Sequence, residues 1–378
     1  MPVIAITSHQ DNQTVTDSPV TIIGTIDDNT AQVTVNGQSA AVGEGIFTSA
    51  AIGLSLGSNE ITVIAIDQSN NQITQTMHLV YSDVTPPSIP TVNPPVSPTN
   101  TTTQALSGTK EANSSIWING SEAVVLDTQT VWSAQVNLSE GTSNFAVTSK
   151  DASENQSQPP VNVSIVFDTT PPTGSITINN DAPYTNSGNV TLNLSATDGT
   201  GTGVSKMQFS NTNNGSDWSP VPATDYATTY PWPLISGDGS KIVYVRFIDA
   251  AGNPSSATIL DAITLDTTAP AQPTIDSVTS PTNSNSQTIT GTKSEDSNSI
   301  MVSCNTANVG QLSYPTSTTW LCQLTNLTAG DNNITVIAHD AAENPSSPTS
   351  ITITYQPAQP LSIAITSPAN NATKYISK

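Results

Sequence analysis

The sequence predicts an all-β protein built from tandem domains, and three observations carry this prediction. Only 10% of the 378 residues are charged, and Leu, Glu, Lys and Arg are scarce beside Thr, Val, Ile and turn-forming residues, which favours short strands over helices. Apolar and polar residues alternate in short runs such as ITVIAI (61–66), as in strands with one face on a core. Three motifs also recur in a fixed order along the chain.

The first motif is a proline-containing linker, with spacings of 85 and 98 residues between its three opening aspartates: Asp83-Val-Thr-Pro-Pro87, Asp168-Thr-Thr-Pro-Pro172 and Asp266-Thr-Thr-Ala-Pro270. The second is Asp-x-x-x-Asn, which precedes each linker and a fourth linker-like position at Gln356: Asp67 to Asn71, Asp151 to Asn155, Asp249 to Asn253, and Asp340 to Asn344. The third is Gly-Thr, found early in three of the periods at Gly24, Gly108 and Gly291.

About seven short strands fit into each period, which is the pattern of an Ig-like β-sandwich. The sequence therefore predicts a tandem array of Ig-like β-sandwich domains joined by short Pro-rich linkers. The predicted divisions are 1–84, 85–169, a divergent third domain at 170–267, 268–356, and the start of a truncated fifth repeat at 357–378. We expect the chain to be a stretch of a longer protein.

The strand before each Asp-x-x-x-Asn motif defines the predicted core. Two of its positions should face inward in every domain: Ile61, Phe145, Val243 and Ile334 at the first, and Val63, Val147, Val245 and Val336 at the second. The aromatic residues Phe47, Trp132 and Trp320 align at the start of another strand and are predicted to be core residues as well.

The net charge of −21 excludes two classes of partner. Eight scattered Lys and Arg residues cannot neutralise a nucleic-acid backbone, and an anionic membrane surface would repel the chain. No apolar run approaches the ~20 residues of a membrane-spanning helix, so no membrane span is expected.

The linker and the Asp-x-x-x-Asn motif together resemble the tandem Ig-like repeats of large bacterial cell-surface proteins and biofilm adhesins. The third domain resembles a distinct subtype through GTGTGV (199–204), the run 237–253 and Trp218. The resemblance implies an extracellular or cell-surface location and a non-catalytic stalk that spaces a binding tip from the cell. It also implies neighbouring repeats of the same chain as partners, with polysaccharide or other surface molecules as further candidates, and Ca²⁺ near domain junctions.

Hard oxygen ligands recur where such calcium sites would lie. In an Ig sandwich the last loop lies at the same end as the entering linker, so linker and loop acids should converge. The candidate ligands are Asp83, Asp151 and Asn155 in the second domain, Asp168, Asp198, Asp249 and Asn253 in the third, and Asp266, Asp340 and Asn344 in the fourth, with Glu111 and Glu295 as additional acids. The alternative is that Asp and Asn only form turns. We favour calcium, because turn chemistry does not by itself explain why an aspartate also opens three linkers.

The two cysteines, Cys304 and Cys322, fall on strands of the fourth domain. In an extracellular chain we predict a disulfide between them, the alternative being two buried thiols.

The aromatic residues of the third domain suggest a second function. Trp218, Tyr226, Tyr230 and Trp232 cluster in sequence and could stack on sugar rings, which would make this domain a carbohydrate-binding module. The alternative, which we favour, is that they fill the interior beneath a long loop.

No catalytic constellation is expected. The three histidines stand at unrelated positions of different repeats, and the acids recur once per domain, whereas a glycosidase site needs one pair of differently tuned carboxylates. The sequence therefore predicts a protein that is not an enzyme.

Overall fold

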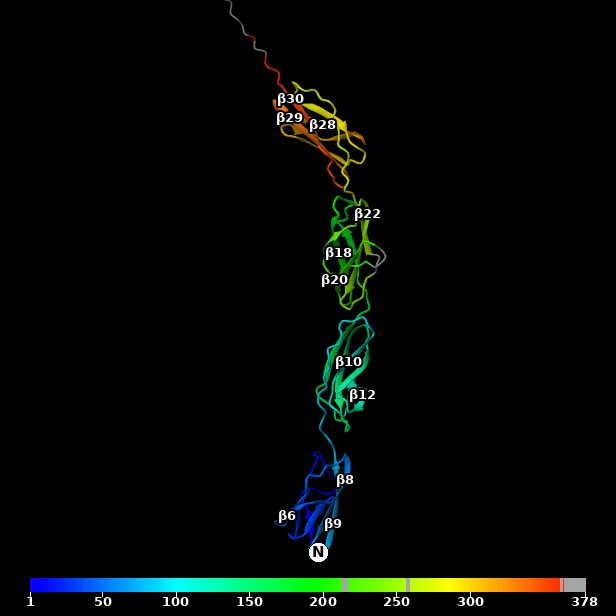
Figure 1. Ribbon diagram of the computed structural model, residues 1–378, viewed down its shortest axis with the longest axis vertical. Coiled ribbons are helices and arrows are strands. Elements are labelled where there is room, and N and C mark those ends of the chain that lie inside the picture. Colours follow the sequence, from blue (N-terminus) through cyan, green and yellow to red (C-terminus); the bar gives the residue numbers. More distant parts are fainter. Residues whose placement is uncertain (213–216, 256–258, 361–362, 364–378) are drawn as a thin grey trace, which may run out of the picture. The chain divides into compact units, whose positions relative to one another are not determined.

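The computed structural model describes residues 1–212, 217–255, 259–360 and 363, and its regular secondary structure consists of β-strands (Figure 1). The predicted all-β Ig-like architecture is confirmed. The start of the predicted fifth repeat lies almost entirely outside the described residues. Among those residues, no helix is both long and apolar enough to cross a membrane.

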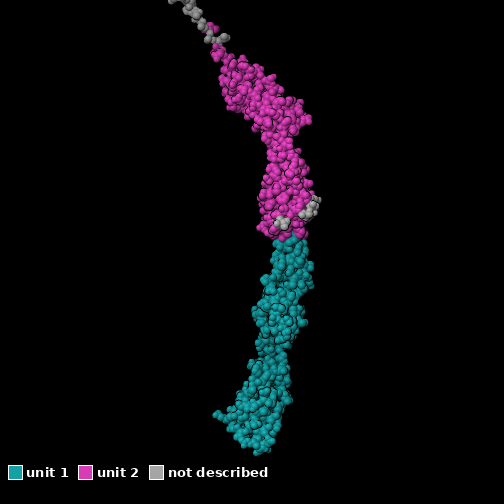
Figure 2. Space-filling view, viewed as in Figure 1, with its two compact units in different colours: residues 1–170, 250–253 teal, residues 171–249, 254–378 magenta. Residues whose placement is uncertain are grey.

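The chain divides into two compact units, residues 1–170 with 250–253 and residues 171–249 with 254–378 (Figure 2). Four hydrophobic clusters lie within the chain, with buried members at 4–79, 106–167, 176–265 and 289–353. Each cluster takes residues from two sheets, and we call the resulting modules the first to fourth sandwich. The clusters fall inside the four predicted domain ranges.

The first sandwich pairs its strands as β1-β3-β7-β6 and β2-β9-β8-β4-β5. Its strands are β1 (Ile4–Ile6), β2 (Gln13–Val15), β3 (Ile23–Ile26), β4 (Gln32–Val35), β5 (Gln38–Ser39), β6 (Ala41–Gly43), β7 (Ile46–Thr48), β8 (Gly57–Ile66) and β9 (Gln72–Tyr81).

The second sandwich has a two-stranded sheet, β10-β13, and a four-stranded sheet, β12-β11-β14-β15. Its strands are β10 (Thr103–Thr109), β11 (Ser114–Ile118), β12 (Ser121–Asp127), β13 (Val131–Asn137), β14 (Gly141–Lys150) and β15 (Val161–Phe167).

The third sandwich has the sheets β16-β18-β21 and β17-β23-β22-β19-β20. Its strands are β16 (Thr173–Ile178), β17 (Tyr184–Thr185), β18 (Asn189–Thr197), β19 (Val204–Ser210), β20 (Ser219–Asp225), β21 (Thr229–Pro233), β22 (Gly239–Asp249) and β23 (Ile259–Leu265).

The fourth sandwich has the sheets β24-β28-β26, with β27 also on β28, and β25-β29-β30. Its strands are β24 (Gln287–Thr292), β25 (Ser299–Cys304), β26 (Asn308–Val309), β27 (Ser313–Thr316), β28 (Thr319–Thr325), β29 (Gly330–His339) and β30 (Thr349–Tyr355).

The predicted core positions are confirmed. Every inward residue named above on β8, β14, β22 and β29 is buried, as are Phe47, Trp132 and Trp320. The Gly-Thr motif has a packing cause, because a Cβ on Gly108 or Gly291 would lie 1.9 Å from the backbone oxygen of Thr91 or Thr274. Any side chain there would therefore push apart a backbone segment that packs against the aromatic core.

This topology places the Asp-x-x-x-Asn motif in an equivalent loop of every sandwich. The motif connects the last two long strands: β8 to β9, β14 to β15, β22 to β23 and β29 to β30. In the second, third and fourth sandwiches, β10, β18 and β24 are each followed by a strand that pairs with the first strand of this hairpin. The pairs are β11 with β14, β19 with β22 and β25 with β29. Residues at equivalent positions of the second, third and fourth sandwiches can therefore be compared with one another.

Candidate metal site

The Asp-x-x-x-Asn loop closes on its own carboxylate. In the fourth sandwich, Asp340 Oδ1 accepts the backbone N–H groups of Ala342 at 2.9 Å and Asn344 at 2.8 Å. The Asn344 side-chain amide donates to Asp340 Oδ2 at 2.8 Å. Glu343, just before the asparagine, has a left-handed backbone with φ 68°. The aspartate thus supplies acceptors for a tight turn that would otherwise leave backbone donors unpaired.

The second and first sandwiches repeat this arrangement. Asp151 Oδ1 accepts from the backbone of Ser153 at 2.8 Å and of Asn155 at 2.9 Å, and the Asn155 amide reaches Asp151 Oδ2 at 2.9 Å. In the first sandwich Asp67 accepts the corresponding bonds from Ser69 and Asn71. These bonds, chiefly the one from the Asn71 side chain, lower the pKa of Asp67 below its ordinary value.

The linker aspartates also form turns. Each accepts, through Oδ1, the backbone N–H of the threonine two residues later, in the pairs Asp83 with Thr85 at 3.0 Å, Asp168 with Thr170 at 2.9 Å, and Asp266 with Thr268 at 3.0 Å. The backbone oxygen of each linker aspartate then accepts the side-chain amide of the loop asparagine. These distances are 2.9 Å from Asn155, 2.8 Å from Asn253 and 2.7 Å from Asn344.

Turn chemistry therefore does account for the aspartate that opens each linker, and the premise that it does not is wrong. The side chain caps the linker turn, and the backbone carbonyl holds the loop asparagine. Recurrence of Asp and Asn follows from these hydrogen bonds alone, so a metal site needs evidence beyond recurrence.

In the second, third and fourth sandwiches a serine two residues after the asparagine completes the loop, and the sequence analysis missed it. Its Oγ accepts the backbone N–H of the preceding strand in three sandwiches, from Ser149 to Ser157 at 2.9 Å, from Phe247 to Ser255 at 2.8 Å, and from Ala338 to Ser346 at 2.9 Å. The constant offset from the asparagine was visible in the sequence and could have revealed it.

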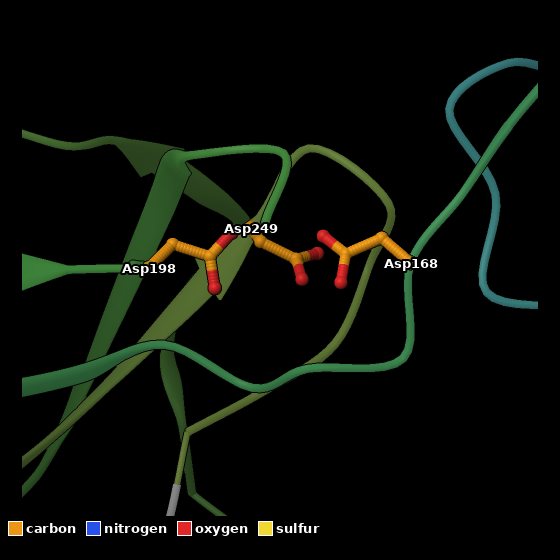
Figure 3. Close-up of side chains that lie close together, drawn as sticks. All are labelled: Asp168, Asp198 and Asp249. Atoms are coloured by element: carbon orange, nitrogen blue, oxygen red, sulfur yellow. The ribbon is translucent and has the colours of Figure 1, made fainter. Parts of the chain in front are cut away.

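The third copy of the loop has an additional feature. Asp168, Asp198 and Asp249 each offer a carboxylate oxygen, and these oxygens all lie within 4.8 Å of one another. The residues are only 2%, 6% and 3% exposed. Figure 3 shows Asp168 and Asp249 facing each other, with the Asp198 carboxylate directed toward Asp249. Of the part of the chain that the structure describes, this is the sole group of three such side chains near enough to share a metal ion.

The hydrogen bonding of Asp198 gives independent evidence that this group of three carboxylates could hold a cation. Its Oδ2 accepts the backbone N–H of Gly203 at 2.8 Å, whereas its buried Oδ1 has no hydrogen-bond partner within the described residues. A buried carboxylate oxygen without a donor is costly, and neighbouring negative charges add to that cost. A cation would remove both penalties.

The donor set suits a hard divalent cation. Ca²⁺ takes oxygen ligands at about 2.3–2.6 Å, so two ligand oxygens of one ion lie at most roughly 5 Å apart, and carboxylate oxygens within 4.8 Å of one another can share one ion. Backbone carbonyls and water would complete the six to eight ligands that Ca²⁺ requires. The three aspartates fit calcium in both chemistry and spacing.

Among the residues that the structure describes, the other predicted ligands do not form a group of three acids close enough to share an ion. Asp83, Asp151 and Asp266 are half-buried, Asp340 is buried, and Asn155, Asn253 and Asn344 use their amide groups as donors in the loop. Glu111 is exposed and accepts the backbone N–H of Ser88 at 2.7 Å, and Glu295 is exposed.

The predicted disulfide is not formed, since Cys304 and Cys322 are both free. Cys322 lies in the core on β28, and its thiol donates to the backbone oxygen of Gly310 at 3.3 Å. Cys304 lies on β25 in the other sheet, where its sulfur accepts the backbone N–H of Ala307 at 3.4 Å. Each sulfur is held by its own local partner, and burial raises the pKa of the Cys322 thiol.

The aromatic residues proposed for glycan contact belong to the interior. Trp218 and Trp232 are buried, and Tyr226 and Tyr230 pack against the same hydrophobic cluster. The Tyr230 ring stacks on Phe209 with centroids 4.8 Å apart. Sugar stacking requires an open aromatic face, so the burial of Trp218 and Trp232 favours the core interpretation over glycan contact.

Comparison with protein families gives two matches. A model for domain B of glucodextranase matches residues 2–82, and a model for bacterial Ig-like domains of group 3 matches residues 127–213. The second match begins within the second sandwich and ends within the third. No curated protein sequence matches the chain.

Several solved structures are similar over most of the chain. Bacterial invasin, titled an integrin-binding protein, is 16% identical over 94% of this chain and 79% of its own, with a TM-score of 0.40. A four-domain ectodomain fragment of ICAM-5 is 11% identical over 94% and 100%, with a TM-score of 0.40. A tetra-tandem repeat from a large adhesion protein is 16% identical over 93% and 98%, with a TM-score of 0.27.

The chain's own sheets and the family match agree on the architecture. The chain is a tandem array of Ig-like β-sandwiches, and residues 127–213 match a model for bacterial Ig-like domains.

Proposed function

We propose that this chain is a non-catalytic, extracellular spacer segment of a bacterial adhesion-related protein. The observation that carries the proposal is repetition, since the same loop, linker and core positions recur in successive sandwiches. Conserving one structural device in every module is expected of a spacer, whereas a binding or catalytic site needs to occur only once. The match to a bacterial Ig-like domain model supports the same interpretation.

A replacement experiment tests the spacer role in the full-length protein. The 378-residue segment is exchanged for an unrelated tandem Ig-like segment with the same number of domains, and adhesion of cells carrying it is measured. A spacer predicts that adhesion persists with the replacement and falls when the segment is deleted. Loss of adhesion with the replacement would show that this segment itself recognises the partner.

The proposal includes a calcium ion bound by Asp168, Asp198 and Asp249. The support is the close approach of three buried carboxylates and the unpartnered Oδ1 of Asp198. Extracellular calcium modules bind with dissociation constants of about 10⁻⁴–10⁻³ M, so 10 mM Ca²⁺ would stabilise the folded state by about 1 to 3 kcal/mol. Such an ion would hold the linker residue Asp168 to the loops of the third sandwich and stiffen the segment there.

Calorimetry and small-angle X-ray scattering in Ca²⁺ and in EDTA test this part. We expect a melting transition that rises with Ca²⁺ and a change in the radius of gyration, both lost in Asp198→Asn. Mg²⁺ serves as the control for general ionic effects, because its octahedral geometry at 2.0–2.1 Å is less tolerant. If neither melting nor compactness responds to Ca²⁺, the calcium proposal fails and the spacer proposal is judged by the replacement experiment.

A second candidate function is an accessory segment of a secreted carbohydrate-acting protein. The match of residues 2–82 to domain B of glucodextranase favours it. A glycan array probed with the chain separates the two candidates. Binding to a defined glycan would favour the accessory role, and no binding would favour the spacer.

A further inference from the structure

The loops of the second, third and fourth sandwiches share one closure, which we call the latch. It consists of the Asp-x-x-x-Asn loop and the backbone oxygen of the linker aspartate. In the second sandwich the Asn155 amide nitrogen lies 2.9 Å from both Asp83 O and Asp151 Oδ2. In the fourth, the Asn344 nitrogen lies 2.7 Å from Asp266 O and 2.8 Å from Asp340 Oδ2.

In the second and fourth latches a neutral NH₂ group bridges a linker oxygen and a loop carboxylate oxygen. Two oxygens that face each other need a donor or a cation between them, and here the asparagine is that donor. The loop carboxylates of Asp151 and Asp340 each receive three N–H bonds in all. These latches are therefore complete without a metal ion.

One position distinguishes the third copy. In the third sandwich the residue directly after β18 (Asn189–Thr197) is Asp198. The corresponding residues after β10 (Thr103–Thr109) and β24 (Gln287–Thr292) are Lys110 and Lys293. The local sequences align without a gap as Gly-Thr-Lys, Ala-Thr-Asp and Gly-Thr-Lys.

The two lysines have the same local role. Lys110 donates to the backbone oxygen of Ser114 at 2.7 Å, and Lys293 donates to that of Ser297 at 2.6 Å. The Lys110 side chain is fully buried and also pairs with Asp127 at 2.8 Å. A lysine at this position offers no ligand atom, and in both sandwiches its ammonium group is bound to the backbone oxygen four residues later.

We infer that the residue after this strand decides which latch binds metal: Asp198 makes the third copy a calcium site, and Lys110 and Lys293 keep the second and fourth copies metal-free. This inference rests on the proposed calcium site and narrows it to one ion per chain. The chain would then contain one latch that responds to calcium, in the third sandwich, and two latches, in the second and fourth, whose stability does not depend on calcium concentration.

Hydrogen exchange read by mass spectrometry on the whole chain, in Ca²⁺ and in EDTA, tests this inference. We expect calcium to slow exchange at least fivefold in peptides covering 195–205 and 245–255. Peptides covering 148–157 and 337–346 should not change. Asp198→Asn and Asp198→Lys should both abolish the calcium effect, the second by reproducing the residue of the neighbouring sandwiches.

Asn155→Ala is the matched control, because it opens the second latch and should leave the calcium effect at 195–205 intact. Circular dichroism and the exchange pattern in EDTA show whether each variant folds. One folded Asp198 variant is sufficient to test whether the calcium effect is lost. Calcium protection at all three loops would overturn this inference and leave the calcium proposal standing. Absence of calcium protection everywhere would overturn both.

Discussion

The loops at Asp249 and Asp340 share the Asp-x-x-x-Asn motif, but their carboxylates have different surroundings. Asp340 is surrounded by the donors of its own turn, with three N–H groups on its carboxylate. Asp249 lies with two further buried carboxylates, and Oδ1 of one of them, Asp198, has no donor among the residues that the structure describes. The comparison teaches that a repeated acidic motif need not define repeated metal sites, because the residue that follows the strand ending in Thr197 or Thr292 is an acid, Asp198, in one copy and a base, Lys293, in the other.

The largest effect should come from removing the buried loop carboxylate of the fourth sandwich. Asp340→Ala leaves three donors unpaired around a residue that is 4% exposed, and we expect a loss of about 3 kcal/mol in the stability of the fourth sandwich. Exchange of the β29 and β30 amides measures it. The loss should be equal in Ca²⁺ and EDTA, and a calcium-dependent loss would contradict the metal-free latch.

Removing the bridging amide should have a smaller effect. Asn155→Ala deletes the bonds to Asp83 O and Asp151 Oδ2 in a half-buried loop, and we expect a loss of about 1 to 2 kcal/mol in the second sandwich. The β14 and β15 amides report it. Exchange in the first sandwich provides the internal control, and an unchanged second sandwich would show that the latch contributes nothing to stability.

Asp198 should give an effect of the opposite sign when calcium is absent. Asp198→Asn removes one of three clustered negative charges and can keep its acceptor for Gly203 N–H, so we expect the third sandwich to gain about 1 kcal/mol in EDTA. In saturating Ca²⁺ the same variant should be less stable than the native chain. Calorimetry in both buffers detects the crossing, and a loss in EDTA would contradict a cluster that lacks its counter-ion.

The smallest effect should be the acid response of the first loop. The pKa of Asp67 lies below its ordinary value of about 3.8 because of bonds from Asn71 and Ser69. Its contribution to stability is therefore present above that value and is lost as the pH falls through the lowered pKa. Asp67→Asn should flatten part of the acid-induced loss in exchange protection of β8 and β9. Asp17→Asn, an exposed aspartate outside the loop, should not.

Sequence alone was sufficient to predict the architecture. Period-two alternation around Ile61, Phe145, Val243 and Ile334 defined the core strands, because burial on one face of a strand repeats every second residue. The site was only partly predictable. The sequence identified Asp168, Asp198 and Asp249 as candidates, but it could not tell a ligand from a turn former, since both roles use carboxylate oxygen.

Side-chain direction accounts for the remaining errors. Cys304 and Cys322 were correctly placed on two strands, yet each sulfur has a local partner and no disulfide joins them. The latch serines escaped notice because serine is abundant in the chain. Their role depends on a backbone N–H that only the folded hairpin brings within reach, as Ser346 shows with Ala338.

Counting bound calcium tests the central claim most directly. Equilibrium dialysis of the whole chain at millimolar Ca²⁺, with elemental analysis of the retained metal, measures the number of specifically held ions per chain. The account predicts one ion for the native chain and none for Asp198→Asn, with Asn155→Ala still holding one. Three ions per native chain, or one ion that survives Asp198→Asn, would contradict it.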